Sequence, residues 1–116
     1  MWSVDIELIA QWLVSLEEDS REQVVAAIEL LEDRGPHLGR PIVDTVTASQ
    51  HANMKELRPG PSGRSELRIL FAFDPVRQAI MLVAGDRAGN WKQWYKQNIP
   101  AADDLFDGHP RSLKGE

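Results

Sequence analysis

The stretch "ELRILFAFDPVRQAIMLVAG", residues 66–85, decides the fold because it has the pattern of a single β-hairpin. Its first half alternates, with Leu67, Ile69, Phe71 and Phe73 on one face of a strand and Arg68, Leu70 and Ala72 on the other. Asp74-Pro75 then opens a turn, and "QAIMLVAG" returns as an apolar partner strand. Because both strands are almost continuously apolar, we expect them at the centre of a sheet covered on at least one face.

The N-terminal part predicts two helices that form an antiparallel hairpin. Residues 6–17 form an amphipathic helix in this interpretation, although residues 2–6 ("WSVDI") allow a short first strand instead. Ser20 and Gln23 have the spacing of a capping box and predict the start of the second helix, which Gly35-Pro36 ends.

The remaining segments are shorter. Residues 37–53 predict a loop with one extended piece, "MKELR" (54–58) a short strand, and "PGPSG" (59–63) a turn. Asn90 is the expected N-cap of an aromatic helix, and Pro100 the expected start of another helical turn. The sum is one α+β domain over residues 1–116, with a small antiparallel sheet against an N-terminal helical hairpin and a C-terminal helix.

Composition narrows the class of protein. The chain has 116 residues, a net charge of −5 and no cysteine, which excludes disulfides and cysteine-ligated metal sites. No apolar run approaches the roughly 18 residues of a membrane helix, and the acidic start is unlike a signal peptide. We therefore expect a cytoplasmic protein with no membrane association.

The average charge conceals an asymmetry. Residues 1–36 hold nine acids and two bases, whereas residues 37–99 hold five acids and nine bases. The last stretch, residues 100–116, holds four acids and two bases. A basic face on an acidic body is therefore expected, and its local field determines what binds there.

Four cations lie beside the predicted strands, namely Lys55, Arg58, Arg68 and Arg87. Aligned strand ends would bring them together, and such a cluster can hold a phosphate and stabilise charge in a phosphoryl transition state. The alternative is that each cation pairs with a neighbouring carboxylate, from among Glu56, Glu66 and Asp86.

The segment "GDRAGNWKQWY", residues 85–95, combines cations with large aromatic residues. Trp91, Trp94 and Tyr95 share one helical face, which is typical of a core stripe. An exposed ring would instead stack on a base, and the Tyr95 hydroxyl could serve acid–base chemistry. His37, His51 and His109 lack metal-ligand spacing, so we expect no metal; only His51 lies near the cation cluster.

Residues 51–95, from "HANMKELR" to "GDRAGNWKQWY", resemble the toxins of the RelE/HigB group in the RelE/ParE superfamily, which belong to bacterial type II toxin–antitoxin modules. The shared features are a "KELR" strand, an "LRILFAFDP.R.A" hairpin and an "L.AGD+.G" segment before an aromatic helix. The segment "LLEDRGPHLGRPIVD" (30–44) is also similar, and the likeness spans roughly residues 4–110. The resemblance implies the same α+β fold.

The activity implied by this resemblance is cleavage of mRNA on the ribosome, without metal or cofactor, by attack of the substrate's own 2′-hydroxyl. The implied catalytic residues are Lys55, Arg68, Arg87 and Tyr95, and the implied RNA-binding residues are His51, Arg58, Trp91 and Lys92. Since arginine stays protonated, the general base remains open among Lys55, Glu56, His51 and Tyr95. The alternatives are a ParE-like inhibitor of gyrase and a non-catalytic protein-binding module.

The resemblance also implies a cognate antitoxin, HigA-like and of the helix-turn-helix type. Opposite charge speeds encounter and fixes register, so we expect the antitoxin to contact Lys55, Arg58 and Arg87. The other docking surface is the N-terminal helices.

Overall fold

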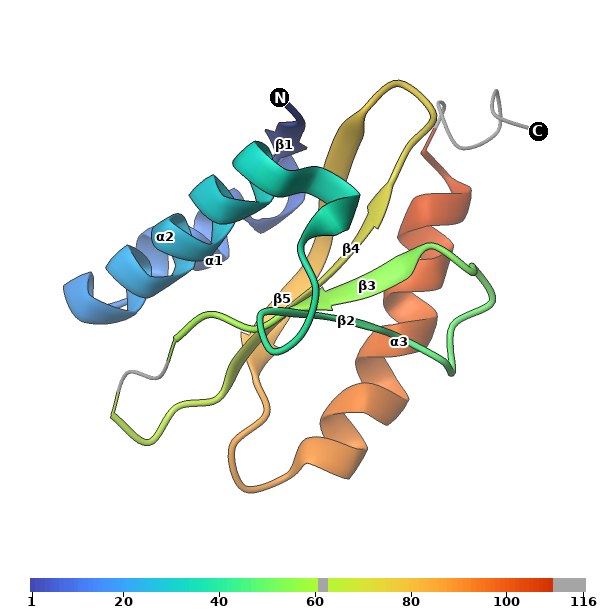
Figure 1. Ribbon diagram of the computed structural model, residues 1–116. Helices are drawn as coiled ribbons and strands as arrows, with labels where there is room; N and C mark the ends of the chain where they lie inside the picture. The colour runs from blue at the N-terminus through green and yellow to red at the C-terminus, as the bar shows by residue number, and fades with distance from the viewer. Residues whose placement is uncertain (61–62, 110–116) are drawn as a thin grey trace.

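The computed structural model describes residues 1–60 and 63–109, in which a mixed sheet separates two helical layers (Figure 1). The elements are, in chain order, β1 (Ser3–Asp5), the 3-10 turn η1 (Glu7–Ile9), α1 (Ala10–Ser15), α2 (Glu18–Arg34), the 3-10 turn η2 (Gly35–His37), β2 (Val43–Thr45), β3 (Met54–Leu57), β4 (Leu67–Phe73), β5 (Gln78–Asp86) and α3 (Trp91–Asp107). The expected turn at 59–63 and the domain 1–116 extend partly outside the described residues. The α+β prediction is confirmed.

The sheet is built around the predicted hairpin. The strand order is β1-β5-β4-β3-β2, so β4 and β5 lie inside the sheet. All neighbouring pairs are antiparallel except β1 with β5, which is parallel. The Asp74 carboxylate accepts hydrogen bonds from the backbone N–H groups of Val76 and Gln78, at 2.9 and 3.0 Å, and so closes the β4–β5 turn.

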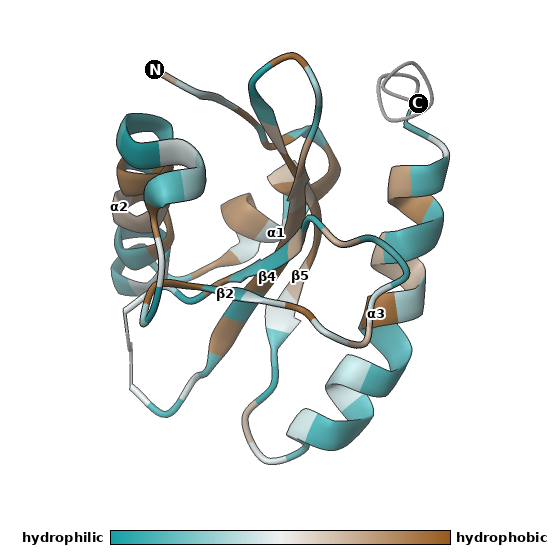
Figure 2. Ribbon diagram, turned by 45° about the vertical axis from the view of Figure 1, so that its right-hand side comes forward, coloured by the Kyte–Doolittle hydropathy of each residue, from teal (hydrophilic) through white to brown (hydrophobic). Residues whose placement is uncertain are grey.

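The two faces of β4 pack against different layers, as its alternation predicts. Leu67, Ile69, Phe71 and Phe73 belong to the core under α1 and α2. Leu70 and Ala72 belong to a second core under α3, together with Ile99, Ala102 and Phe106 of that helix. Figure 2 shows β4 and β5 coloured largely as hydrophobic, whereas α3 alternates between hydrophobic and hydrophilic residues. Arg68, near the start of β4, lies on the same face as Leu70. The face of the sheet under α3 is therefore polar at the start of β4 and apolar farther along the strand.

The N-terminal segment differs from the expected single helix over residues 6–17. The optional first strand forms as β1, because parallel pairing with β5 satisfies its backbone groups, and the helix shortens to η1 and α1. Arg21 caps the end of α1 by donating to the carbonyl oxygens of Leu13, Val14 and Leu16. The predicted capping box is wrong: α2 begins at Glu18, with no side-chain cap, and the acidic residues of its first turn favour the helix dipole instead.

The C-terminal helix is also longer than expected. Pro100 does not start a new helical turn but lies inside the continuous helix α3, which buries Ile99, Ala102 and Phe106 on either side of it. This burial offsets the backbone hydrogen bond that proline cannot donate. Asn90 is the N-cap residue, as predicted, but its side chain makes no capping hydrogen bond.

None of the helices in residues 1–60 and 63–109 is both long and apolar enough to cross a membrane.

Gly85 of β5 positions α3 on the sheet. A Cβ atom at this position would come within 2.6 Å of Nε1 of Trp94, whereas a Cβ atom at Gly39 would meet nothing within 4 Å. We expect Gly85→Ala to lower the free energy of unfolding by about 1–3 kcal/mol, the usual effect of overpacking. Urea denaturation measures this, with Gly39→Ala as the matched control. Equal stability of the two variants would contradict the close packing of Trp94 on β5.

Candidate active site

The centre of the site is the carboxylate of Glu56, in β3. Alternation along β3 places Met54 and Glu56 on the α3 face of the sheet, and Met54 packs in the core there. The Glu56 side chain is only 4% exposed. A buried carboxylate requires partners, and they come from the end of β3 itself and from the start of the neighbouring strand β4.

Two arginines hold Glu56. Nε of Arg58 donates to Oε1 of Glu56 at 2.8 Å, and Nε of Arg68 lies 3.6 Å from the same oxygen. Nη2 of Arg58 also donates to Asp44 of β2 at 3.2 Å. The Arg68 side chain is 13% exposed, and its Nη1 donates to the backbone carbonyl oxygen of Leu67. The buried Nε atom of Arg68 has no hydrogen-bond acceptor among residues 1–60 and 63–109, so this guanidinium retains donor capacity.

Tyr95 and Arg87 complete the cluster. Nη1 of Arg87, which follows β5, donates to the Tyr95 hydroxyl at 3.0 Å, and its guanidinium lies over the Tyr95 ring. Nε of Arg87 donates to Glu66 at 3.1 Å. The carboxylate of Asp86 accepts backbone N–H groups of Glu66 and Ala88 instead and so shapes the loop. Each sequence interpretation is therefore correct in part: Arg58, Arg68 and Arg87 gather here and pair with carboxylates, whereas Lys55 does not join them.

The protonation of Tyr95 depends on this cluster. Burial raises the pKa of Tyr95 above its usual 10.0, and the hydrogen bond to Glu56 raises it further, whereas Arg87 and Arg68 oppose the shift. The pKa of Arg58 is also raised, mainly by its hydrogen bond to Glu56. Tyr95 is therefore a neutral proton donor, and Arg58 a permanent cation, at neutral pH.

A hollow of about 340 Å³ opens beside these groups. Glu56, Arg58, Arg87, Trp91 and Tyr95 line one side of it, and residues 45–48 line the other. Its volume is within the range of small-ligand sites. Trp91 stands at the rim and is 53% exposed, so the expectation that it packs in the core is wrong. Trp94 does pack on the α3-side core, and Lys92 lies over the Trp91 ring at 5.5 Å.

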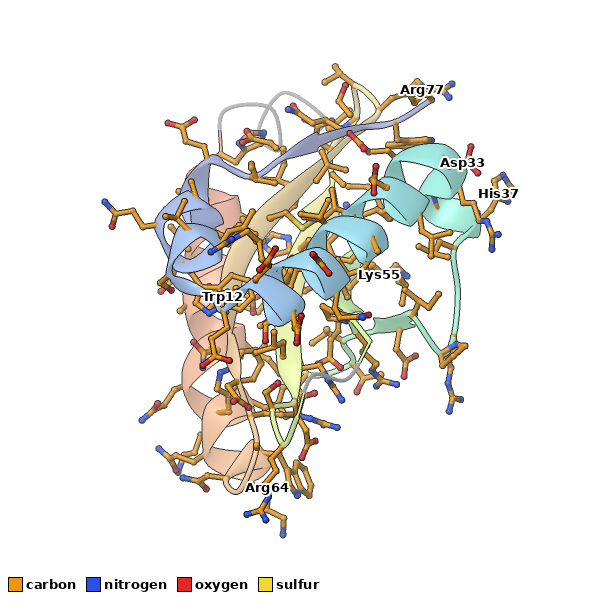
Figure 3. All side chains as sticks on the ribbon, turned by 90° about the vertical axis from the view of Figure 1, so that its left-hand side faces the viewer. Trp12, Asp33, His37, Lys55, Arg64 and Arg77 are labelled. Carbon is orange, nitrogen blue, oxygen red and sulfur yellow. The ribbon has the colours of Figure 1, made fainter. Side chains whose placement is uncertain are left out.

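Two of the predicted site residues lie elsewhere. Lys55 occupies the opposite face of β3, where its Nζ donates to Thr45 at 3.0 Å; Figure 3, viewed from the α2 side, labels it beside α2. His51 pairs with Asp107 at 2.8 Å, at the far end of α3, about 18 Å along the helix from Tyr95. Strand alternation separates Lys55 from Glu56, although the two are adjacent in sequence.

Glu56 lies at the centre of the cluster, although the sequence analysis named it only as one of four candidates for the general base. The signal was present: in "MKELR" it follows Met54 by two positions, so a carboxylate lies on a buried strand face. Asp44 gave no comparable signal, because its role depends on the pairing of β2 with β3. In the described part of the chain, no three His, Asp or Glu side chains are grouped so that they could hold a metal ion.

Comparisons with known proteins agree with the resemblance seen in the sequence. Residues 11–107 match the family described as phage-derived protein Gp49-like. The chain is 61% identical over 108 residues to "Putative toxin HigB2" of Mycobacterium tuberculosis, a match that covers 93% of the chain and 54% of that protein. It is 58% identical over 95 residues to "Putative toxin HigB3" of the same organism, covering 82% and 81%. The chain thus spans about half the length of the first relative.

Because Tyr95 is the only tyrosine of the chain, its ionisation can be followed directly by ultraviolet absorbance. We expect its pKa to lie above 10.0, to fall in Glu56→Gln, which removes the neighbouring negative charge, and to rise in Arg87→Ala, which removes an opposing cation. Glu7→Gln, in η1, is the control. Shifts of the same sign in both cluster variants would contradict the geometry.

Proposed function

The chain belongs to the Gp49-like family and to the HigB-type toxins of toxin–antitoxin modules, and we propose that it is an endoribonuclease that cleaves mRNA on the ribosome. The observation that supports the proposal is the buried Glu56 carboxylate between Arg58 and Arg68, with the Tyr95 hydroxyl beside it. Glu56, Arg58 and Tyr95 thus supply a proton acceptor, a cation and a proton donor at one hollow, and Arg68 lies against Glu56 beside it.

The proposed reaction uses these groups in the order in which charge develops. Glu56 accepts the proton of the substrate's 2′-hydroxyl, and the 2′ oxygen attacks the adjacent phosphorus atom. Arg68 and Arg87 stabilise the negative charge of the phosphorane. The bond to the 5′ oxygen then breaks, and Tyr95 donates a proton to that oxygen. The products are a 2′,3′-cyclic phosphate and a free 5′-hydroxyl, and proton exchange with water restores both side chains.

To bind the substrate phosphate, Arg87 must give up its ion pair with Glu66. Its pair with Glu66 is exposed to solvent, with side chains 23% and 47% accessible, and such pairs contribute only about 0.2–1 kcal/mol. A phosphate offers a stronger bidentate acceptor. Arg87 can therefore turn from Glu66 to the substrate at low cost.

A neutralising antitoxin is the proposed partner, as in other toxin–antitoxin modules. The contact surface expected from sequence, Lys55, Arg58 and Arg87, spans both faces of the sheet. An antitoxin that touches all three must wrap around the β2–β3 edge. Binding to α1 and α2 is the alternative, and reversal of the three charges distinguishes the two.

We expect Glu56→Gln, Arg68→Ala and Arg87→Ala each to lower the rate of mRNA cleavage by about 10²–10³-fold, the usual effect of removing one transition-state contact. Growth arrest on induced expression and mapping of mRNA 5′ ends measure the loss. Arg34→Ala, at the end of α2, is the control. Lys55→Ala tests the role predicted from sequence, and its position on the other face leads us to expect cleavage to persist.

Three results would contradict the proposal. Full cleavage by all three cluster variants would exclude this site. Growth arrest by the wild-type protein with intact mRNA and damaged DNA would indicate a ParE-like action on gyrase instead, and the absence of any growth effect would indicate a binding module.

A further inference from the structure

A second hollow, of about 400 Å³, lies along α3 next to the candidate active site. Its walls are α3 and the segment around Ala48 and Gln50. Ala48, Tyr95 and Ile99 line both hollows, so the two adjoin at these residues. The second hollow is therefore within reach of the neighbouring part of a flexible chain bound at Glu56.

Two lysines at this hollow occupy positions that a helix disfavours. Lys92 and Lys96 are four residues apart on α3, where like charges repel each other. Lys92 is also in the first turn of the helix, where the helix dipole disfavours a cation. Within residues 1–60 and 63–109, no carboxylate forms an ion pair with either lysine, unlike Arg58, Arg68 and Arg87. An anion bound between them would remove this unfavourable charge.

The rest of the hollow combines an apolar part with a negative far end. Ile99 and Pro100 supply its floor. The buried carboxylate of Asp103 accepts hydrogen bonds from the Ser49 hydroxyl and, at 3.0 Å, from the backbone N–H group of Gln50, which fixes the opposite wall. Asp103 and Asp104 make the far end negative, so an anion is accepted only at the lysine end, nearest Tyr95.

We propose that this hollow binds a nucleotide of single-stranded RNA adjacent to the one cleaved, with its phosphate between Lys92 and Lys96 and its base on Ile99 and Pro100. The assignment rests on the proposed function and extends it from one phosphate to a two-nucleotide site. Lys92 was expected to bind RNA from sequence, whereas Lys96, Ile99 and Pro100 enter only through the structure.

The test measures binding of a short single-stranded RNA whose 2′-hydroxyls are replaced by fluorine, which removes the nucleophile. The affinity is determined at several salt concentrations for the wild type, Lys96→Ala, Lys96→Arg and Arg34→Ala. Loss of one phosphate contact lowers the slope of log affinity against log salt by about 0.7. We expect this change in Lys96→Ala, recovery in Lys96→Arg, and a wild-type slope in Arg34→Ala, which loses the same charge from the other helical layer.

The outcomes separate the two proposals when mRNA cleavage is measured in parallel. An unchanged slope in Lys96→Ala, with cleavage by the wild type, overturns the nucleotide site and leaves the ribonuclease standing. A Lys96-dependent slope without any cleavage supports the nucleotide site and overturns the ribonuclease. Unchanged RNA binding with weakened antitoxin binding overturns the nucleotide site and assigns the hollow to the protein partner, and no RNA binding by the wild type overturns it as well.

Discussion

The burial of one carboxylate, that of Glu56, determines how this end of the sheet is built. An ionised carboxylate inside a protein loses its hydration and must be paired. Arg58 reaches it from the end of the same strand, β3, Arg68 from the start of the neighbouring strand β4, and Tyr95 from α3. Removing one partner of such a buried pair typically costs about 3–5 kcal/mol, whereas apolar replacements of similar size often cost nothing. The buried carboxylate therefore contributes little net stability, which agrees with the catalytic role proposed for it.

The ion pairs around Glu56 differ in how readily they can be exchanged. Glu56 and Arg68 are almost completely buried, so their arrangement is fixed before any ligand arrives. The outer contacts, Arg87 with Glu66 and Arg58 with Asp44, are partly open to solvent. A phosphate can replace those outer carboxylates while the inner pair remains in place. The site is thus preorganised at its centre and adaptable at its rim, which suits a substrate that brings its own negative charge.

Much of the fold could be predicted from sequence because its decisive signals are local. The alternation of Leu67 to Phe73 sets both faces of β4, and both are confirmed. The errors arose where tertiary contacts override local preference. Arg21 ends α1 by a contact made from the next helix, and burial on both sides of Pro100 carries α3 through a proline. Tertiary structure also separates two of the predicted site residues. Lys55 and Glu56 are adjacent in sequence, but their places in the paired strand β3 put them on opposite faces of the sheet.

The layers also separate charge. The acidic α1–α2 hairpin covers one face of the sheet, whereas Lys92 and Lys96 lie on α3, across the sheet from it (Figure 1). The charges thus favour an anion only at the N-terminal half of α3, because the α1–α2 hairpin and the aspartates at the other end of α3 are negative and the net charge is −5. The sheet holds the two sides apart, and the hollow beside Glu56 is lined by Trp91 and Tyr95 from the same half of α3. The charge distribution and the position of the Glu56 cluster thus depend on the same arrangement, a sheet between two helical layers.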